Sequence, residues 1–146
     1  MDWSTFPYSF ASDVKQKKEV KKVKSMTSTK TLKRKIILSG NPVSTNLIYR
    51  KHGHIIYMSK EGKELKESYQ WEAKKYWKEP PIEGDVEIEI ELFFENNLRR
   101  DIDNWNKILL DSLTGIVWKD DSQIEKMTIK KNIDKFYPRI EINIKN

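Results

Sequence analysis

Apolar and polar residues alternate most regularly in the segment 85–95. Every second position carries a large apolar side chain, namely Val86, Ile88, Ile90, Leu92 and Phe94. The positions between them are mainly acidic: Asp85, Glu87, Glu89 and Glu91. A period of two is typical of a half-buried β-strand, because successive side chains point to opposite faces of a sheet. The pattern therefore predicts a strand with one apolar and one acidic face.

Other segments with the composition of strands are residues 31–38, 54–58, 124–131 and 138–145. Two further segments have a helical period instead. The first follows Ser59, a suitable N-cap, and ends before Pro80-Pro81. Its apolar stripe consists of Leu65, Tyr69, Ala73 and Tyr76. The second runs from about Asn104 to Thr114, and Gly115 is placed to close it. Its apolar stripe consists of Trp105, Ile108, Leu109 and Leu113.

The predicted order of elements is β, β, α, β, α, β, β. This order indicates a single small α+β domain, with a mixed or antiparallel sheet and two main helices packed on it. Trp71 and Trp77 lie off the apolar stripe of the first helix. Because aromatic residues are enriched at interfaces, we expect these two side chains to be available for a dimer contact.

The excess of positive charge lies at the start of the chain. The 146 residues have a net charge of +6, but residues 1–38 contain ten basic and three acidic residues, and residues 39–146 contain 18 basic and 19 acidic ones. We therefore expect a basic N-terminal extension, residues 1–30, followed by one domain at 31–146. The extension contains six closely spaced lysines: Lys15, Lys17, Lys18, Lys21, Lys22 and Lys24.

Several roles are open for this lysine run. Such runs attract nucleic-acid phosphates through counterion release, and this is the role that we favour. The alternatives are a solubilising tail and a segment that docks on the acidic strand at 85–95, in the same subunit or in its partner. That acidic face would repel DNA, so we expect it to point away from DNA or to be covered.

Composition excludes several classes of protein. No run of about eighteen apolar residues is present, so we expect no membrane span. The segment MDWSTFPYSF lacks the features of a secretory signal. Cysteine is absent, which excludes disulfides and thiolate zinc sites. A cytoplasmic protein is the simplest interpretation.

Carboxylates and a lysine gather before, within and after the second helix. Asp101 and Asp103 lie two residues apart in an extended segment, so their side chains share a side. Lys107 and Asp111 follow on one helical face, opposite the apolar stripe. After the helix, we expect a tight return to bring Asp120-Asp121 beside Asp101.

Converging carboxylates repel one another and are tolerated when a divalent cation neutralises them. Oxygen ligands select Mg²⁺ or Mn²⁺ rather than zinc. A lysine beside such a site suits a phosphate or a developing oxyanion. Arg99 and Arg100 are placed to hold flanking phosphates. These residue types together describe metal-assisted hydrolysis of a phosphodiester.

Each residue also has a plainer interpretation. Asp103 or Asn104 could be a helix cap. Lys107 and Asp111 could form an ordinary i,i+4 pair worth about 0.3 kcal/mol. The Asp120-Asp121 pair could be only a turn.

Aromatic and histidine residues near these segments have simpler roles. Trp118 is expected to be a core residue that holds the Asp120-Asp121 turn, rather than a platform for base stacking. His52 and His54 flank Gly53 and are too few for a metal site without carboxylates. We expect them in a loop that touches DNA.

A longer motif joins these positions: Arg100-Asp101-x-Asp103-Asn104-x-x-Lys107-x-x-x-Asp111, then Leu113-Thr114-Gly115, then Trp118-x-Asp120-Asp121-x-Gln123. Upstream of it stand Pro42-x-Ser44-x-Asn46, Tyr49-Arg50 and Ser59-x-Glu61-Gly62. Over roughly residues 36–145, these motifs resemble those of the RusA family of Holliday-junction resolvases. The basic N-terminal extension departs from the compact pattern of that family.

The resemblance implies a small homodimeric endonuclease that depends on Mg²⁺, with Mn²⁺ as a possible substitute. It implies neither a small-molecule cofactor nor association with a membrane. It implies cleavage of four-way junction DNA by paired symmetric nicks, in DNA recombination and repair. Such proteins are often encoded by prophages.

The resemblance also implies roles for individual residues. The metal-binding catalytic carboxylates would be Asp101, Asp103 and Asp121, with Asp120 as a further ligand. Lys107 would be needed for cleavage. We expect a further set of side chains to contact DNA: Arg99, Arg100, Asn104, Arg50, Lys15, Lys17, Lys18, Lys21 and Lys22.

Two other functions stay open at this point. One is a junction-binding protein that does not cut, although a pure DNA binder gains nothing from unneutralised acids near phosphate. The other is a nuclease of broader selectivity that cuts flaps or replication forks.

Overall fold

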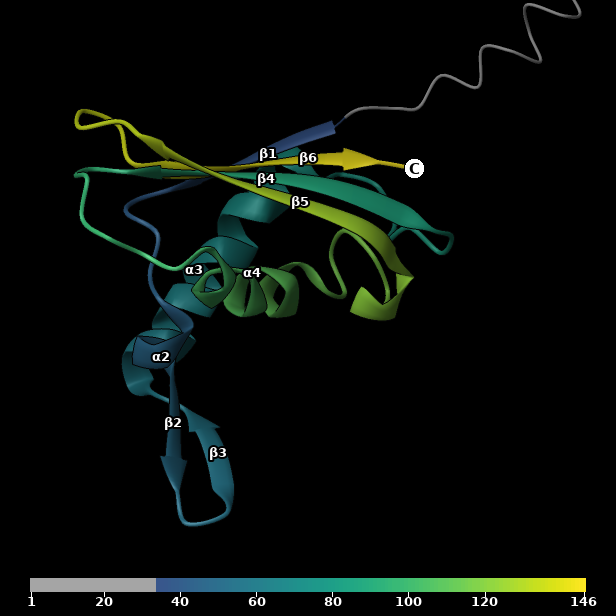
Figure 1. Ribbon diagram of the computed structural model, residues 1–146. Helices are drawn as coiled ribbons and strands as arrows, with labels where there is room; N and C mark the ends of the chain where they lie inside the picture. The colour runs from purple at the N-terminus through teal and green to yellow at the C-terminus, as the bar shows by residue number, and fades with distance from the viewer. Residues whose placement is uncertain (1–33) are drawn as a thin grey trace, which may run out of the picture. The chain divides into compact units, whose positions relative to one another are not determined.

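A computed structural model describes residues 34–146. The N-terminal extension, which contains the run of six lysines, lies outside the described residues, as does the start of the strand expected at 31–38. The described elements form a four-stranded sheet, a separate two-stranded sheet and a layer of helices (Figure 1). In chain order they are β1 (Arg34–Ser39), α2 (Thr45–Ile48), β2 (Tyr49–His52), β3 (Ile55–Met58), α3 (Lys60–Tyr76), β4 (Val86–Phe94), η1 (Ile102–Asn104), α4 (Asn106–Leu113), η2 (Asp121–Gln123), β5 (Ile124–Ile133) and β6 (Arg139–Lys145).

The larger sheet is mixed, with the strand order β1-β6-β4-β5. β6 pairs antiparallel with both β1 and β4, whereas β5 pairs parallel with β4. A parallel pair needs a crossover connection, and here the connection contains η1, α4 and η2. The predicted α+β fold is confirmed, and the choice between a mixed and an antiparallel sheet falls on the mixed one.

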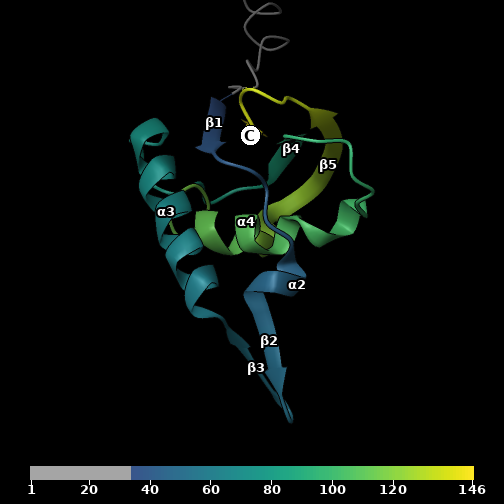
Figure 2. The ribbon, with the colours of Figure 1, turned by 90° about the vertical axis from the view of Figure 1, so that its left-hand side faces the viewer.

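Helices α3 and α4 cover one face of this sheet (Figure 1, Figure 2). The apolar positions of β4 point toward them, and the register places Ile36, Ile142 and Ile90 side by side across three strands. Tyr69 and Ala73 from α3, and Leu109 from α4, are buried against this row. Among the described helices, none is long and apolar enough to cross a membrane.

The opposite face of the sheet contains the acidic positions of β4, but it is not an acidic surface. Glu87 lies beside Lys126 on β5 and Lys145 on β6 in the register. Lys145 also forms an ion pair of 2.5 Å with Glu89. The expected repulsive face is thus corrected to one of mixed charge, because the flanking strands supply lysines that the pattern of β4 alone does not reveal.

Glu141 is the most deeply buried carboxylate on this opposite face. Its oxygens lie 2.9 Å from Lys35 Nζ and 3.0 Å from Arg139 Nε. Burial raises the pKa of Glu141, but the hydrogen bonds and charges of Lys35 and Arg139 outweigh it and hold the pKa below its usual value. Glu141 therefore stays ionised within the sheet.

Tryptophan 77 differs from its prediction. The helix α3 ends at Tyr76, and Trp77 follows as its C-cap with extended backbone (φ −108°, ψ 104°). The side chain therefore leaves the helical pattern and enters the core, where it is 5% exposed. A dimer contact through Trp77 is wrong for this reason. Trp71 is 64% exposed and has Lys75 Nζ over its ring at 3.7 Å.

The elements α2 and β2 were not predicted from the sequence. α2 has only four residues, too few to display a helical period, although the Ser44 side chain accepts a hydrogen bond from the backbone N–H of Asn46. β2 is mostly basic and polar and has no apolar alternation. It forms because it pairs with β3 through a turn at Gly53, whose φ of +61° favours glycine. The resulting hairpin extends away from the helices (Figure 1, Figure 2).

Candidate functional site

The residues of the long motif lie in the crossover between β4 and β5. Asp101 precedes the short helix η1, and its side chain makes no capping hydrogen bond. The backbone carbonyl of Asp101 accepts a hydrogen bond from Trp105 Nε1. Trp105 is buried and packs edge-to-face on Phe94, with ring centroids 5.0 Å apart. The core therefore fixes the backbone of this segment, whereas the Asp101 and Asp103 side chains are exposed.

The helix-cap alternative for this segment is not realised. The N-cap of α4 is Trp105, and no side chain caps that helix. Within the described residues, the carboxylates of Asp101 and Asp103 have no hydrogen-bonding or ion-pair partner. Both carboxylates are therefore accessible from the solvent.

Lys107 and Asp111 do not form the i,i+4 ion pair that their spacing allows. Tyr49, from the start of β2, contacts both of them instead. Its hydroxyl donates a hydrogen bond to Asp111 Oδ2, and Lys107 Nζ lies 4.4 Å from the centroid of its ring. A cation over an aromatic face is attracted by the ring quadrupole. Tyr49 thus orients an ammonium group and a carboxylate on one face of α4.

The protonation of Tyr49 suits this arrangement. Burial raises the pKa of Tyr49 well above its usual value, and the hydrogen bond with Asp111 and the charge of that carboxylate raise it further. The phenol therefore stays protonated and remains the donor to Asp111 at any working pH.

The Asp120-Asp121 turn is built by residues of the same motif. Asp120 caps η2, since its Oδ1 accepts a hydrogen bond of 3.0 Å from the Ser122 N–H. The Gln123 side chain accepts from the Asp120 N–H at 2.8 Å and donates to the carbonyls of Ile82 and Gly84. The turn is therefore held to the segment that precedes β4.

Trp118 supports the same turn from inside the core. It is fully buried, and its Nε1 donates a hydrogen bond of 3.0 Å to Thr114 Oγ1. Gly115 has a φ of +89° and its N–H bonds to the Trp118 carbonyl at 2.7 Å, which makes the tight return possible. The prediction that Trp118 is a core residue, not a stacking platform, is confirmed.

Electrostatics join the turn to α4. The hydrogen bond with the Asp120 carboxyl raises the pKa of Asp121, and desolvation and the negative charges of Asp120 and Asp111 raise it further. The backbone N–H of Ser122 lowers the pKa of Asp120. The return therefore brings Asp121 close enough to Asp111 for the two carboxylates to repel each other.

The arrangement of carboxylates is more spread than the sequence suggested. Asp101 and Asp103 precede α4, whereas Asp111 lies in its last turn beside Asp121; eight residues of helix span roughly 12 Å. Among residues 34–146, no three acidic or histidine side chains lie close enough together to hold a metal ion. The sequence predicted that Asp120-Asp121 would lie beside Asp101, but the described residues do not form that cluster of carboxylates.

The chemistry of these donors nevertheless fits a hard divalent cation. They are carboxylate oxygens without thiol or imidazole, which is the set that Mg²⁺ and Mn²⁺ prefer. A cation between the carboxylates would relieve the repulsion that raises the pKa of Asp121.

The two arginines before the motif differ. Arg100 donates to the Asn96 carbonyl at 3.1 Å and to the Asn96 side chain at 2.6 Å, and it lies over the Phe94 ring. Its guanidinium is therefore used to close the loop after β4. Arg99 is exposed, and Asn104 is partly buried in η1.

Sequence reasoning gave no role to Tyr49 or Gln123. Their presence in the motifs quoted from the sequence was the only signal that could have pointed to them. Tyr49 contacts Asp111, 62 positions away, and Gln123 contacts Gly84, 39 positions away. No local pattern predicts contacts at such separations.

Comparison with known proteins identifies the family of the chain. Residues 39–145 match the family model for endodeoxyribonuclease RusA. Curated proteins include no significant match to this chain. The family model covers well over half of the chain, including β4, α4 and the whole motif from Arg100 to Gln123. The chain therefore belongs to the RusA endodeoxyribonuclease family.

Proposed function

We propose that this protein is an endonuclease that resolves four-way DNA junctions with the help of Mg²⁺. The observation that carries the proposal is the set formed by Tyr49, Lys107 and Asp111 beside the Asp120-Asp121 turn, within a chain of a nuclease family. An ammonium group held next to repelling carboxylates suits a phosphodiester, whose charge increases in the transition state.

Lys107 would stabilise the negative charge that develops on the scissile phosphate. The Tyr49 ring limits the positions that the Lys107 ammonium can occupy, which reduces the reorganisation needed at the moment of reaction. Tyr49 is a positioning residue in this scheme, because it acts through Lys107 and Asp111. The exposed Arg99 would bind a flanking phosphate.

The proposed metal ligands are the motif carboxylates of Asp101, Asp103 and Asp121, with Asp120 beside Asp121. Because Asp101 and Asp103 precede α4 and Asp121 follows it, no three of them lie within reach of one ion in the described residues, and a shared Mg²⁺ would require the two segments to approach each other. Asp111, which repels Asp121 and is held by Tyr49, extends this set. When bound, Mg²⁺ would act as a Lewis acid and make a water molecule a better nucleophile. Asp120 also caps η2, so its substitution would disturb the turn as well as the ligand set.

A homodimer would suit the proposed substrate. A four-way junction has near two-fold symmetry, and a dimer with C₂ symmetry presents two identical sites to it. The two sites of the dimer would then make paired symmetric nicks in the junction. The proposed setting is DNA recombination and repair, and a prophage is one proposed source of the protein.

The test uses a labelled four-way junction, a flap and a linear duplex, each incubated with Mg²⁺ and with EDTA. We expect cutting of the junction in Mg²⁺, with Mn²⁺ as a substitute, and none in EDTA. Equal cutting of the flap would favour a nuclease of broader selectivity. If the protein binds these substrates but cuts none of them, the proposed nuclease activity is refuted.

A further inference from the structure

The hairpin β2–β3 has an unusual composition for a surface element. The segment 41–60, which includes it, contains no acidic residue. β2 supplies the exposed basic side chains Arg50 and Lys51, and two histidines flank the turn. The helix α3, in contrast, mixes acidic and basic residues along its length. The hairpin therefore presents positive charge that no side chain of its own neutralises.

The same hairpin also exposes apolar side chains. Ile55 is 67% exposed, Ile56 66% and Tyr57 48%. The register pairs these residues with His52, Lys51 and Arg50, so each face of the ladder carries basic and apolar groups together. A two-stranded hairpin is at best marginally stable alone. Neighbouring exposed apolar side chains are typical of a surface that binds a ligand or a partner.

The base of the hairpin is fixed to the candidate site. Its first residue, Tyr49, contacts Lys107 and Asp111. The Ser59 N–H donates a hydrogen bond of 2.7 Å to the Ile48 carbonyl. A Cβ at Gly62 would lie only 2.5 Å from Ile48 Cγ2, so glycine is required for α3 to begin this close to α2. The direction of the hairpin is therefore set relative to Lys107.

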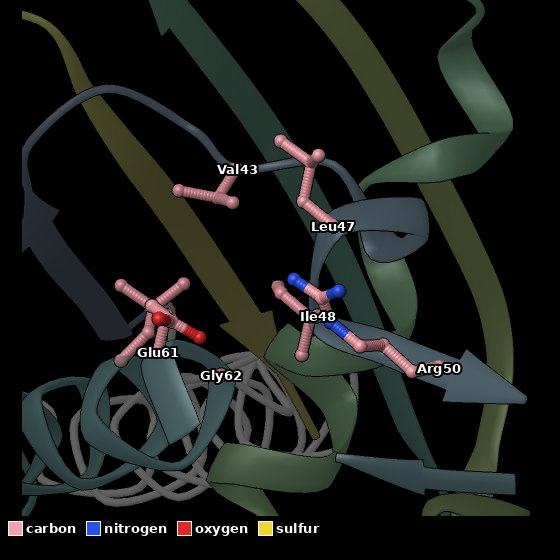
Figure 3. A pocket seen from close by; sticks show the side chains of 7 residues that line it. Val43, Leu47, Ile48, Arg50, Glu61 and Gly62 are labelled. Carbon is pink, nitrogen blue, oxygen red and sulfur yellow. The ribbon is translucent and has the colours of Figure 1, made fainter. Parts of the chain in front are cut away.

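Figure 3 shows the side chains at this base. They line an open cavity of about 370 Å³ with a mostly apolar wall, which includes Val43, Leu47 and Leu65. Arg50 from β2 and Glu61 from α3 also line it, without forming an ion pair. The guanidinium of Arg50 therefore keeps its donors available to a ligand.

We propose that the hairpin β2–β3 is an arm that grips DNA beside the scissile phosphate, with Arg50 and Lys51 on backbone phosphates and Ile55, Ile56 and Tyr57 against sugars and bases. This inference rests on the proposed function, because it names the part of the molecule that would hold the same substrate. Positive charge binds the backbone, and apolar side chains inserted between base steps stabilise distorted DNA such as a branch point. A second copy of the chain would bury this positive charge without supplying acids from its own hairpin.

The first experiment measures junction affinity in EDTA over a series of salt concentrations. The arm variant is Arg50→Ala with Lys51→Ala in the full chain. The matched control, Lys74→Ala with Lys78→Ala, removes two positive charges near the C-terminal end of α3, one in its last turn and one two residues beyond it. We expect the arm variant to lose at least about tenfold in affinity and about 1.8 from the salt slope, since each phosphate contact adds about 0.9. The control should bind as the wild type does.

The second experiment uses the absence of cysteine from the chain. Ile56→Cys provides a single thiol on the arm, and Lys78→Cys provides one two residues beyond the end of α3. We expect junction DNA to slow maleimide labelling of the first at least about tenfold and to leave the second unchanged. Slower labelling at higher protein concentration without DNA would instead identify the arm as an interface between copies of the chain, and would overturn the proposal.

The two experiments separate this proposal from the proposed function. If the wild type cuts junctions and the arm variant binds with an unchanged salt slope, the arm is refuted and the nuclease stands. If the arm variant loses affinity and the wild type cuts no DNA, the nuclease is refuted and the arm stands as a DNA-binding element.

Discussion

The open face of the four-stranded sheet and the surface formed by α4, η2 and the hairpin β2–β3 are both rich in charge, but their charges are arranged differently. On the sheet, Glu89 pairs with Lys145, and Glu141 lies between Lys35 and Arg139. On the second surface, like charges are neighbours. The Asp120 carboxyl, desolvation and the negative charges of Asp120 and Asp111 raise the pKa of Asp121. Arg50 and Lys51 lie in a segment without acids.

Under the proposed function, the paired charges of the sheet serve the fold and the like charges of the second surface serve a ligand. Exposed opposite charges stabilise a fold weakly, by about 0–1 kcal/mol for each pair. Like charges held together destabilise it and are expected where a ligand of opposite charge binds. Charge removed from the sheet should therefore alter stability, and charge removed from the second surface should alter cleavage or DNA binding.

The largest effect is expected at the carboxylates. Asp101→Asn, Asp103→Asn and Asp121→Asn should each lower the cleavage rate of a junction on the order of 100-fold or more, because each removes a charged ligand with little change of shape. Junction binding in EDTA should persist. Glu89→Gln makes the same chemical change on the sheet and should cut at the wild-type rate; equal losses in both regions would contradict the comparison.

The N-terminal extension should give the next largest effect. On the sheet, Glu89 and Glu141 already have lysine partners, so they offer little to a further basic segment. Deletion of residues 1–28 removes six lysines and should lower the salt slope of junction affinity by up to about 5. Thermal unfolding should hardly change. A lower melting temperature with an unchanged slope would mean that the extension docks on the protein.

Tyr49 should give a smaller effect that separates its two contacts. Tyr49→Phe keeps the ring beneath Lys107 but removes the hydroxyl that binds Asp111, and should lower kcat about tenfold. Tyr49→Leu also removes the ring and should approach the activity of Lys107→Ala. KM should change little in Tyr49→Phe. A rise in KM with unchanged kcat would show that Tyr49 serves binding rather than the positioning of Lys107.

The pH dependence of stability should report on the sheet. The pKa of Glu141 is held below its ordinary value of 4.5, so the unfolded chain binds the proton more readily than the native chain. The stabilisation from this carboxylate is thus complete above about pH 5 and is lost as the pH falls through the native pKa. Glu141→Gln should be about 1–2 kcal/mol less stable at pH 7. In urea unfolding it should lose less than the wild type between pH 7 and pH 3; an equal loss would refute this role.

The smallest effect is expected for the ion pair between Lys145 and Glu89. Lys145→Ala should lower the free energy of unfolding only slightly at low salt, and by less still in 1 M NaCl, where screening removes the interaction. Cleavage should not change. A loss of stability that survives high salt would mean that Lys145 acts through packing instead of charge.

Much of the local structure was predictable from the sequence. The alternation over 85–95 predicted β4, Ser59 predicted the start of α3, and Gly115 predicted the end of α4. The buried Trp118 was also expected. These features follow from side-chain spacing and capping groups within a few residues, so neighbours along the chain suffice to encode them. The motif from Arg100 to Gln123 likewise identified the family from its residues alone.

Features that depend on distant segments were decided only by the tertiary structure. The parallel pairing of β4 with β5 and the pairing of β4 with β6 place lysines beside the acidic positions of β4, which changes the charge of that face. Tyr49 lies between Lys107 and Asp111 because β2, more than fifty residues earlier, begins beside α4. Trp77 enters the core because the backbone turns where α3 ends. The physical reason is that the spacing and charge of neighbouring residues determine the local secondary structure. The contacts of a side chain depend on which distant segments the fold brings next to it.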